Sequence, residues 1–139
     1  MRGLLADANV QGHQARIAKL LERSGLWDIL VEIGLEFAEL SDIGLPHDVD
    51  DRTLWQRCQD DGWVLFTDNR NDDGELSLQA TLADSWAPGN LPILTLADKQ
   101  QFERSTEYRE RVAYDIADVL FGLTGGEYRD RDRIFVPRR

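Results

Sequence analysis

The sequence predicts an α/β fold with three layers, α/β/α, around a mostly parallel sheet of four or five strands. Short apolar runs alternate along the chain with longer stretches in which apolar residues recur at helical spacing. Such alternation is typical of a parallel sheet covered by helices on both faces. The 139 residues contain no internal repeat and no low-complexity linker, so we expect one domain, residues 1–139, with a charged C-terminal tail at about 124–139.

Apolar runs bounded by polar or turn-forming residues predict the strands. The run from Trp63 to Thr67 is rich in aromatic and β-branched residues and is the clearest of them. The run before Asp7 is shorter, and residues 36–40 alternate polar with apolar side chains. The expected strands are residues 4–6, 36–40, 63–67 and 91–96, and residues 134–136 could add an edge strand.

Helical spacing of apolar residues, followed by glycine or proline, predicts the helices. Ile17 and Leu21 share one side of the first helix, which Gly25 ends. A loop at residues 42–50 leads to a helix that Asp50 or Asp51 caps. The expected helices are residues 10–24, 26–33, 51–61, 75–86 and 106–123.

Composition limits the class of protein. The chain is 42% hydrophobic and 30% charged, as folded globular domains are. No apolar run approaches the roughly 18 residues that span a bilayer, so we expect no membrane association. The N-terminus turns acidic at Asp7, too early for a signal peptide. The single cysteine, Cys58, fits a reducing cytoplasm and is expected to be a small core residue.

The net charge of −10 is unevenly distributed. Residues 1–98 carry 7 basic and 18 acidic side chains, whereas residues 99–139 carry 9 and 8. An acidic body lacks the electrostatic footprint of a strong nucleic-acid binder. A nuclease stays open, because metal ions can bridge an acidic cleft to phosphate.

Acidic and amide side chains follow two of the expected strands. Asp7 follows the first strand, Asp51 begins a helix, and a polar cluster at 68–73 follows the strand 63–67. Parallel strands end at the same edge of a sheet, so we expect Asp7 and the cluster to converge there. Oxygen ligands of this kind suit a hard divalent cation, although each could instead be a turn former or a helix cap. His13 is expected to be a surface residue.

Three short motifs resemble those of PIN-like domains, in particular a small bacterial group. The strand end Leu4-Leu5-Ala6-Asp7-Ala8-Asn9 is similar to their Leu-Leu-x-Asp-Glu-Asn opening. Asp51 lies three residues before the aliphatic Leu54, and that group likewise has an acid three residues before an aliphatic helix residue. An apolar strand then ends where they have Thr-x-Asp-x-Asp, beginning here at Thr67. The resemblance covers roughly residues 3–86.

The resemblance implies a PIN-like fold and a Mg²⁺- or Mn²⁺-dependent endoribonuclease, often the toxin of a toxin–antitoxin pair. RNA, a small antitoxin-like protein and a second copy in a homodimer are the partners that it suggests. Ala8 replaces the family's glutamate, and the family's last two acids fall on asparagines. The expected catalytic residues are Asp7, Asp51, Asp68 and Asp72, and the expected metal ligands are Asp7, Asp51, Asp68, Asn69 and Asn71.

Two alternatives remain open at the level of sequence. One is a non-catalytic PIN-like binding module, because an asparagine carbonyl can ligate a cation but adds no charge and cannot act as a general base. The other is an unrelated doubly wound domain of the receiver type, which would use Asp7, a phosphorylatable aspartate and Lys99. A metal-binding experiment separates the first alternative from an active nuclease.

Overall fold

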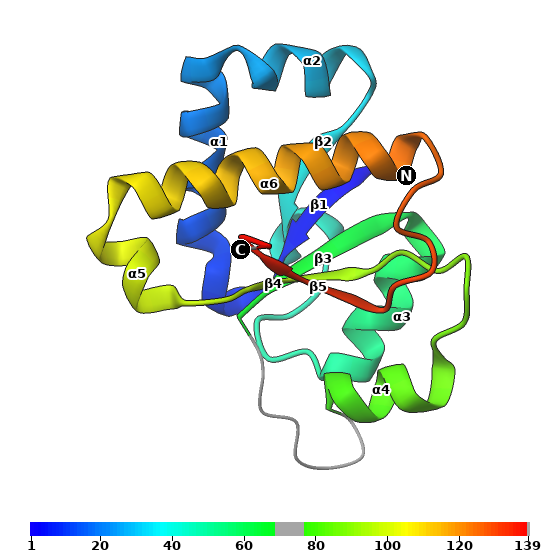
Figure 1. The fold of residues 1–139 in the computed structure, drawn as a ribbon. Coiled ribbons are helices and arrows are strands. Elements are labelled where there is room, and N and C mark those ends of the chain that lie inside the picture. The colour runs from blue at the N-terminus through cyan, green and yellow to red at the C-terminus, as the bar shows by residue number, and fades with distance from the viewer. Residues whose placement is uncertain (69–76, 139) are drawn as a thin grey trace.

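The computed structural model describes residues 1–68 and 77–138. Its core is one sheet of five parallel strands in the order β2-β1-β3-β4-β5. Helices cover both faces of the sheet, so the predicted three-layer α/β/α class is confirmed (Figure 1). The strands are β1 (Gly3–Ala6), β2 (Glu36–Glu39), β3 (Trp63–Thr67), β4 (Ile93–Leu96) and β5 (Arg133–Val136).

The helices alternate with the strands along the chain, which gives the parallel sheet its crossover connections. The α-helices are α1 (Gln11–Ser24), α2 (Leu26–Glu32), α3 (Asp51–Asp61), α4 (Leu78–Ser85), α5 (Lys99–Arg104) and α6 (Thr106–Thr124). Two short 3₁₀ helices are η1 (Ala8–Val10) and η2 (Leu40–Ile43).

Each face of the sheet buries its own apolar cluster, because successive side chains of a strand point to opposite faces. On one face Leu4 and Phe66 pack with the helices α1 and α6. On the other face Leu5 and Leu65 pack with Trp55 of α3 and with residues of α4. Figure 1 shows the same division, with α1, α2 and α6 above the sheet and α3 and α4 below it. The predicted apolar stripes therefore face the core.

Most predicted elements are confirmed, and the differences have local causes. α5 was not predicted, because six residues are too few to show helical periodicity. Asp98 begins it by accepting a hydrogen bond from the main-chain N–H of Gln101 at 3.0 Å, and its buried Phe102 anchors it in the core. Val10 is the last residue of η1, so α1 begins at Gln11, one residue later than expected. η2 occupies the start of the stretch expected to be a loop.

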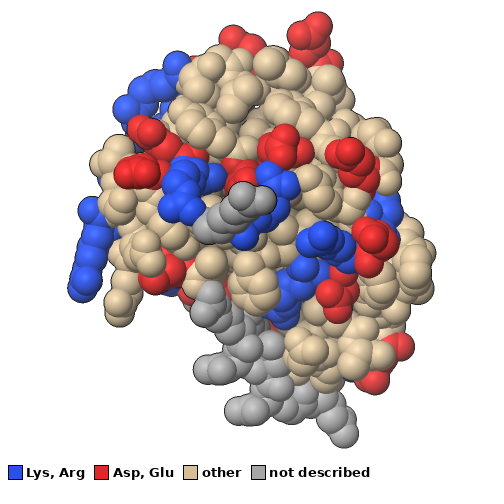
Figure 2. Space-filling model, viewed as in Figure 1, with Lys and Arg blue, Asp and Glu red and all other residues tan. Residues whose placement is uncertain are grey.

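The C-terminal segment packs as part of the domain. Residues 134–136 were expected to add an edge strand, and β5 confirms it by pairing with β4. After β5 the guanidinium of Arg138 donates to Asp115 at 2.7 Å and to Asp118 at 2.6 Å, both on α6. Basic and acidic side chains are interspersed over this face of the molecule, as Figure 2 shows. Arg138 therefore ties the end of the segment to the helix beside it.

Cys58 lies on α3 and is fully buried, which confirms the expectation of a small core residue. Burial raises the pKa of its thiol to about 12, so the thiol stays protonated and unreactive at neutral pH. Among the helices of the described residues, none combines the length and the apolar character needed to cross a membrane.

Candidate functional site

The candidate site lies where the strand order of the sheet reverses. The chain places β2 on one side of β1 and β3 on the other, so the connections leave β1 and β3 in opposite directions. In doubly wound sheets of this order, ligands bind outside the carboxyl ends of the strands at that point. Asp7 follows β1, and Asp68 follows β3. The two acids that sequence reasoning expected to converge are thus placed at this edge.

Asp7 is held by main-chain and side-chain contacts at the edge. Its own N–H donates to the carbonyl oxygen of Phe66 at 3.0 Å, which continues the pairing of β1 with β3. Its Oδ1 accepts from the main-chain N–H of Asn9 at 2.9 Å, and this bond caps η1. Its Oδ2 accepts from the hydroxyl of Thr67. These contacts fix both carboxylate oxygens in one orientation.

The surroundings of Asp7 disfavour its negative charge. Burial raises the pKa of the Asp7 carboxyl, and the hydrogen bonds from Thr67 and Asn9 only partly oppose it. The nearby carboxylates of Asp68 and Asp51 raise this pKa further. A partly buried carboxylate with other carboxylates in its field, at the mouth of a sheet, is a functional-site candidate on physical grounds. A bound cation would relieve the repulsion.

Asp51 is not the N-cap of α3. The cap of α3 is Asp50, whose two carboxylate oxygens accept from the main-chain N–H and the hydroxyl of Thr53, both at 2.8 Å. Asp51 is the first residue of the helix proper, and its charge acts on Asp7. Of the two residues that the sequence left open as the cap, the structure selects Asp50. Capping therefore does not explain an acid at position 51.

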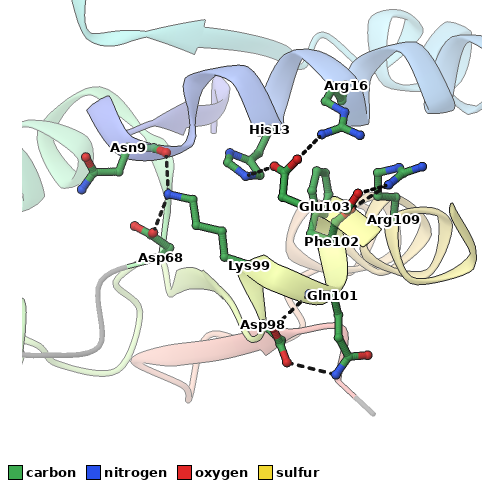
Figure 3. Close-up of polar contacts among 10 residues, drawn as sticks. All are labelled: Asn9, His13, Arg16, Asp68, Asp98, Lys99, Gln101, Phe102, Glu103 and Arg109. Atoms are coloured by element: carbon green, nitrogen blue, oxygen red, sulfur yellow. Dashed lines mark hydrogen bonds and ion pairs between the residues drawn. The ribbon is translucent and has the colours of Figure 1, made fainter. Parts of the chain in front are cut away.

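Lys99, the first residue of α5, supplies the cation of the site. Its ammonium nitrogen lies 3.0 Å from Oδ2 of Asp68 and 3.3 Å from the carbonyl oxygen of Asn9 (Figure 3). The sequence analysis used Lys99 only in the receiver-type alternative, as a lysine that follows the fourth strand. The sequence feature that could have indicated this contact is the position of Lys99 shortly after the end of a parallel strand.

A second polar group adjoins Lys99 between α1 and α5. The carboxylate of Glu103 lies 2.9 Å from Nε2 of His13 and 3.1 Å from the guanidinium of Arg16 (Figure 3). The His13 side chain is only 12% exposed and its ring packs on Phe102, so the expectation of a surface residue was wrong. Burial lowers the pKa of His13, and the charge of Lys99 lowers it further, while Glu103 opposes both. His13 is thus neutral at pH 7.

The expected metal ligands are only partly within the described residues. Asp51 and Asp68 both lie within electrostatic reach of Asp7. Over residues 1–68 and 77–138, however, no three His, Cys, Asp or Glu side chains come close enough to form a metal centre. Asn69, Asn71 and Asp72 lie outside the described residues.

The chemistry of the available ligands does fit a hard cation. The carboxylate of Asp68 and the carbonyl of Asn9 are oxygen ligands, and in this structure they hold the ammonium group of Lys99. Asp7 adds a carboxylate whose charge is only partly compensated. The described part of the site is therefore suited to a cation at the edge of the sheet.

Comparison of the chain with protein-family models, with curated proteins and with solved structures finds no match. The case for function accordingly depends on the fold and on the geometry of the site.

Proposed function

We propose that the protein is a PIN-like, divalent-metal-dependent endoribonuclease with Asp7 at its centre. One observation carries the proposal: Asp7 lies at the switch point of the sheet, partly buried, in the electrostatic field of Asp51 and Asp68. The motifs around these residues resemble those of PIN-like nucleases. A structural explanation of Asp51 as a cap is excluded by Asp50, which strengthens its assignment to the site.

In this proposal Asp7 and Asp68 hold Mg²⁺ or Mn²⁺ at the edge of the sheet, and Asp51 adds negative charge to the site. A cation bound there would activate water and stabilise the charge on the leaving oxygen of an RNA phosphodiester. Asp7 contributes an oriented carboxylate, because Thr67 and Asn9 fix its two oxygens. The acidic body would repel RNA, so the cation also has to attract the phosphate.

The wider setting is part of the same proposal. We place the protein in the cytoplasm, which the single buried cysteine supports. A small antitoxin-like protein and a second copy of the chain are the proposed protein partners. Ile29, Val31 and Ile33, on and just after α2, are all more than two-fifths exposed, and exposed apolar side chains are what such partners bury.

A second candidate function is a non-catalytic PIN-like module. The observation that favours it is the ion pair of Lys99 with Asp68, which already neutralises one carboxylate of the site. In that case the protein would take up no divalent cation and cleave no RNA. Restoring aspartate at Asn69 and Asn71 would then be expected to create metal binding.

Cleavage of labelled RNA with and without Mn²⁺ separates the two candidates. The proposal predicts Mn²⁺-dependent cleavage by the wild type, loss of cleavage in Asp7→Asn, and full activity in Asp28→Asn, which carries the same change on the exposed side of α2. Equal cleavage by Asp7→Asn and wild type would reject the assignment of Asp7. Absence of both cleavage and Mn²⁺ uptake in the wild type would favour the binding module.

A further inference from the structure

The short helix α5 is held against α1 and α6 by polar and aromatic contacts. Toward α1, the carboxylate of Glu103 lies 2.9 Å from Nε2 of His13 and 3.1 Å from the guanidinium of Arg16 (Figure 3). Toward α6, Arg109 donates to the main-chain carbonyl oxygens of Phe102 and Glu103 at 2.8 Å and 3.1 Å. A helix of six residues is not stable in water by itself, so α5 depends on these contacts.

His13 occupies the contact between α1 and α5 with little access to water. Its side chain is 12% exposed, and its ring centroid lies 5.0 Å from that of Phe102. The charged groups that face it are Arg16 from its own helix and Lys99 and Glu103 from α5. Two positive charges therefore stand beside His13 against one negative charge. A protonated imidazole would add a third positive charge at a place that water solvates poorly.

We propose that His13 is a pH-sensitive contact that holds α5 on α1 at neutral pH and releases the helix on protonation. The neutral ring packs on Phe102 without an electrostatic penalty, whereas the imidazolium has to reach water, and moving the short helix away uncovers it. α5 begins with Lys99, whose ammonium lies 3.0 Å from Asp68, so the release also loosens this pair at the candidate site. Neither RNA nor a metal ion takes part in this contact.

The sign of the pH dependence follows from the surroundings of His13. Burial lowers the pKa of the imidazole below its ordinary value of 6.5, the charge of Lys99 lowers it further, and Glu103 only partly opposes them. The stability that His13 contributes to the docking of α5 is therefore fully present above pH 6.5 and is lost as the pH falls through the folded-state pKa.

Hydrogen exchange at the main-chain amides of α5 tests the release. The N–H groups of Phe102 and Ser105 donate to the carbonyl oxygens of Asp98 and Gln101, so they exchange when the helix opens. In the wild type their protection, corrected for the intrinsic exchange rate, should fall about threefold to tenfold between about pH 7.5 and about pH 5.5. The upper limit arises because the lower pH is about one unit below the ordinary histidine value of 6.5.

The substitution His13→Gln removes the titrating group and keeps a polar side chain, so the protection of α5 should change less than about twofold over the same pH range. The matched control is His47→Gln, the same change at the other histidine of the chain, which is exposed between η2 and α3. This control should behave as the wild type does. Should His13→Gln fail to fold, Lys99→Met takes its place, and the loss of a positive charge beside His13 should reduce the fall in protection.

The comparison has clear opposing outcomes. A fall in protection that the wild type and His47→Gln share, and that His13→Gln lacks, supports the release. Protection of α5 that does not change with pH in the wild type overturns it, as does an equal fall in the wild type and in His13→Gln or Lys99→Met. Each of these results leaves the proposed ribonuclease activity untouched, because the exchange measurement involves no metal ion and no RNA.

Discussion

Asp7 combines a precise orientation with an unfavourable environment. Its oxygens accept two hydrogen bonds, yet burial and the neighbouring carboxylates raise the pKa of the group. A residue kept for stability alone would not be placed in such surroundings, because a neutral side chain there would cost less. Sites that hold ligands commonly reduce stability in this way.

We therefore predict that Asp7→Asn stabilises the folded protein at neutral pH. Asparagine has the same shape, its oxygen can accept from Asn9, and its amide can donate to Thr67. The expected gain in free energy of unfolding is about 0.5–2 kcal/mol, measured by urea denaturation without added metal. A destabilised Asp7→Asn would contradict this account of the residue.

The pH dependence of that gain has a definite sign. The folded-state pKa of Asp7 lies above the ordinary value of 3.8, so the folded protein binds this proton more tightly than the unfolded chain. The stability contributed by the group is fully present below pH 3.8 and is lost as the pH rises through the folded-state pKa. The advantage of Asp7→Asn should accordingly shrink as the pH is lowered from neutral toward 3.8.

At the residue scale, sequence reasoning found the acids but missed their cation. Asp7 and Asp68 were predictable, because the ends of parallel strands converge. The contact of Lys99 with Asp68 and Asn9 was not, since it depends on the position of α5, a helix too short to predict. The burial of His13 depends on the same helix, through its contact with Phe102.

At the scale of the elements, the pairing of β1 with β2 depends on one glycine. Gly3 has φ of +149°, and a Cβ atom there would lie 1.8 Å from the carbonyl oxygen of Glu36 on β2. No movement of a flexible side chain can relieve this contact, because the obstacle is backbone. The two strands can approach as they do only with glycine at this position.

Gly3→Ala should therefore destabilise the protein by at least about 2 kcal/mol, as measured by chemical denaturation. The matched control is Gly12→Ala in α1, where an added Cβ would meet nothing within 4 Å. That change should stabilise the protein by about 0.5–1 kcal/mol, because alanine favours the helix. Similar effects of the two substitutions would show that the close approach of β1 and β2 does not limit stability.

The elements were predictable where their pattern was long or strongly apolar. α6 shows helical spacing over 19 residues, and β3 is buried along its whole length, so both were expected almost as they are. η1 and η2 were not expected, because a single turn leaves no periodic signal. Asp7 caps the start of η1 and Glu39 caps the start of η2, and these hydrogen bonds form only in the folded chain.

At the scale of the whole molecule, the C-terminal segment holds the end of β5 against α6. The guanidinium of Arg138 donates to Asp115, to Asp118 and, at 2.7 Å, to the hydroxyl of Tyr128. This contact joins the end of β5 to the helix that crosses the sheet. The sequence predicted the edge strand but not these contacts, because alternating charges do not reveal which partners they meet.

Arg138→Ala should lower the free energy of unfolding by about 1–2 kcal/mol, since it removes several charge-assisted hydrogen bonds from a partly buried group. Arg138→Lys should recover only part of this loss, because lysine cannot bind two carboxylates with a planar fork. Thermal denaturation gives the comparison, with Arg23→Ala on the exposed side of α1 as the control. A wild-type melting curve for Arg138→Ala would show that the segment does not hold the fold together.

The order of the strands connects the fold to the proposed function. The sheet order β2-β1-β3-β4-β5 brings the ends of β1 and β3 together, and the acids after them meet there because of that topology. The central claim is that this point of the sheet binds a divalent cation through Asp7.

Calorimetric titration of Mn²⁺ into the wild type and into Asp7→Asn tests that claim most directly. We predict saturable binding by the wild type and by the control Asp28→Asn, and binding at least about tenfold weaker in Asp7→Asn, because one carboxylate ligand and its charge are lost. Binding of equal strength in wild type and Asp7→Asn, or no binding by the wild type, would contradict it.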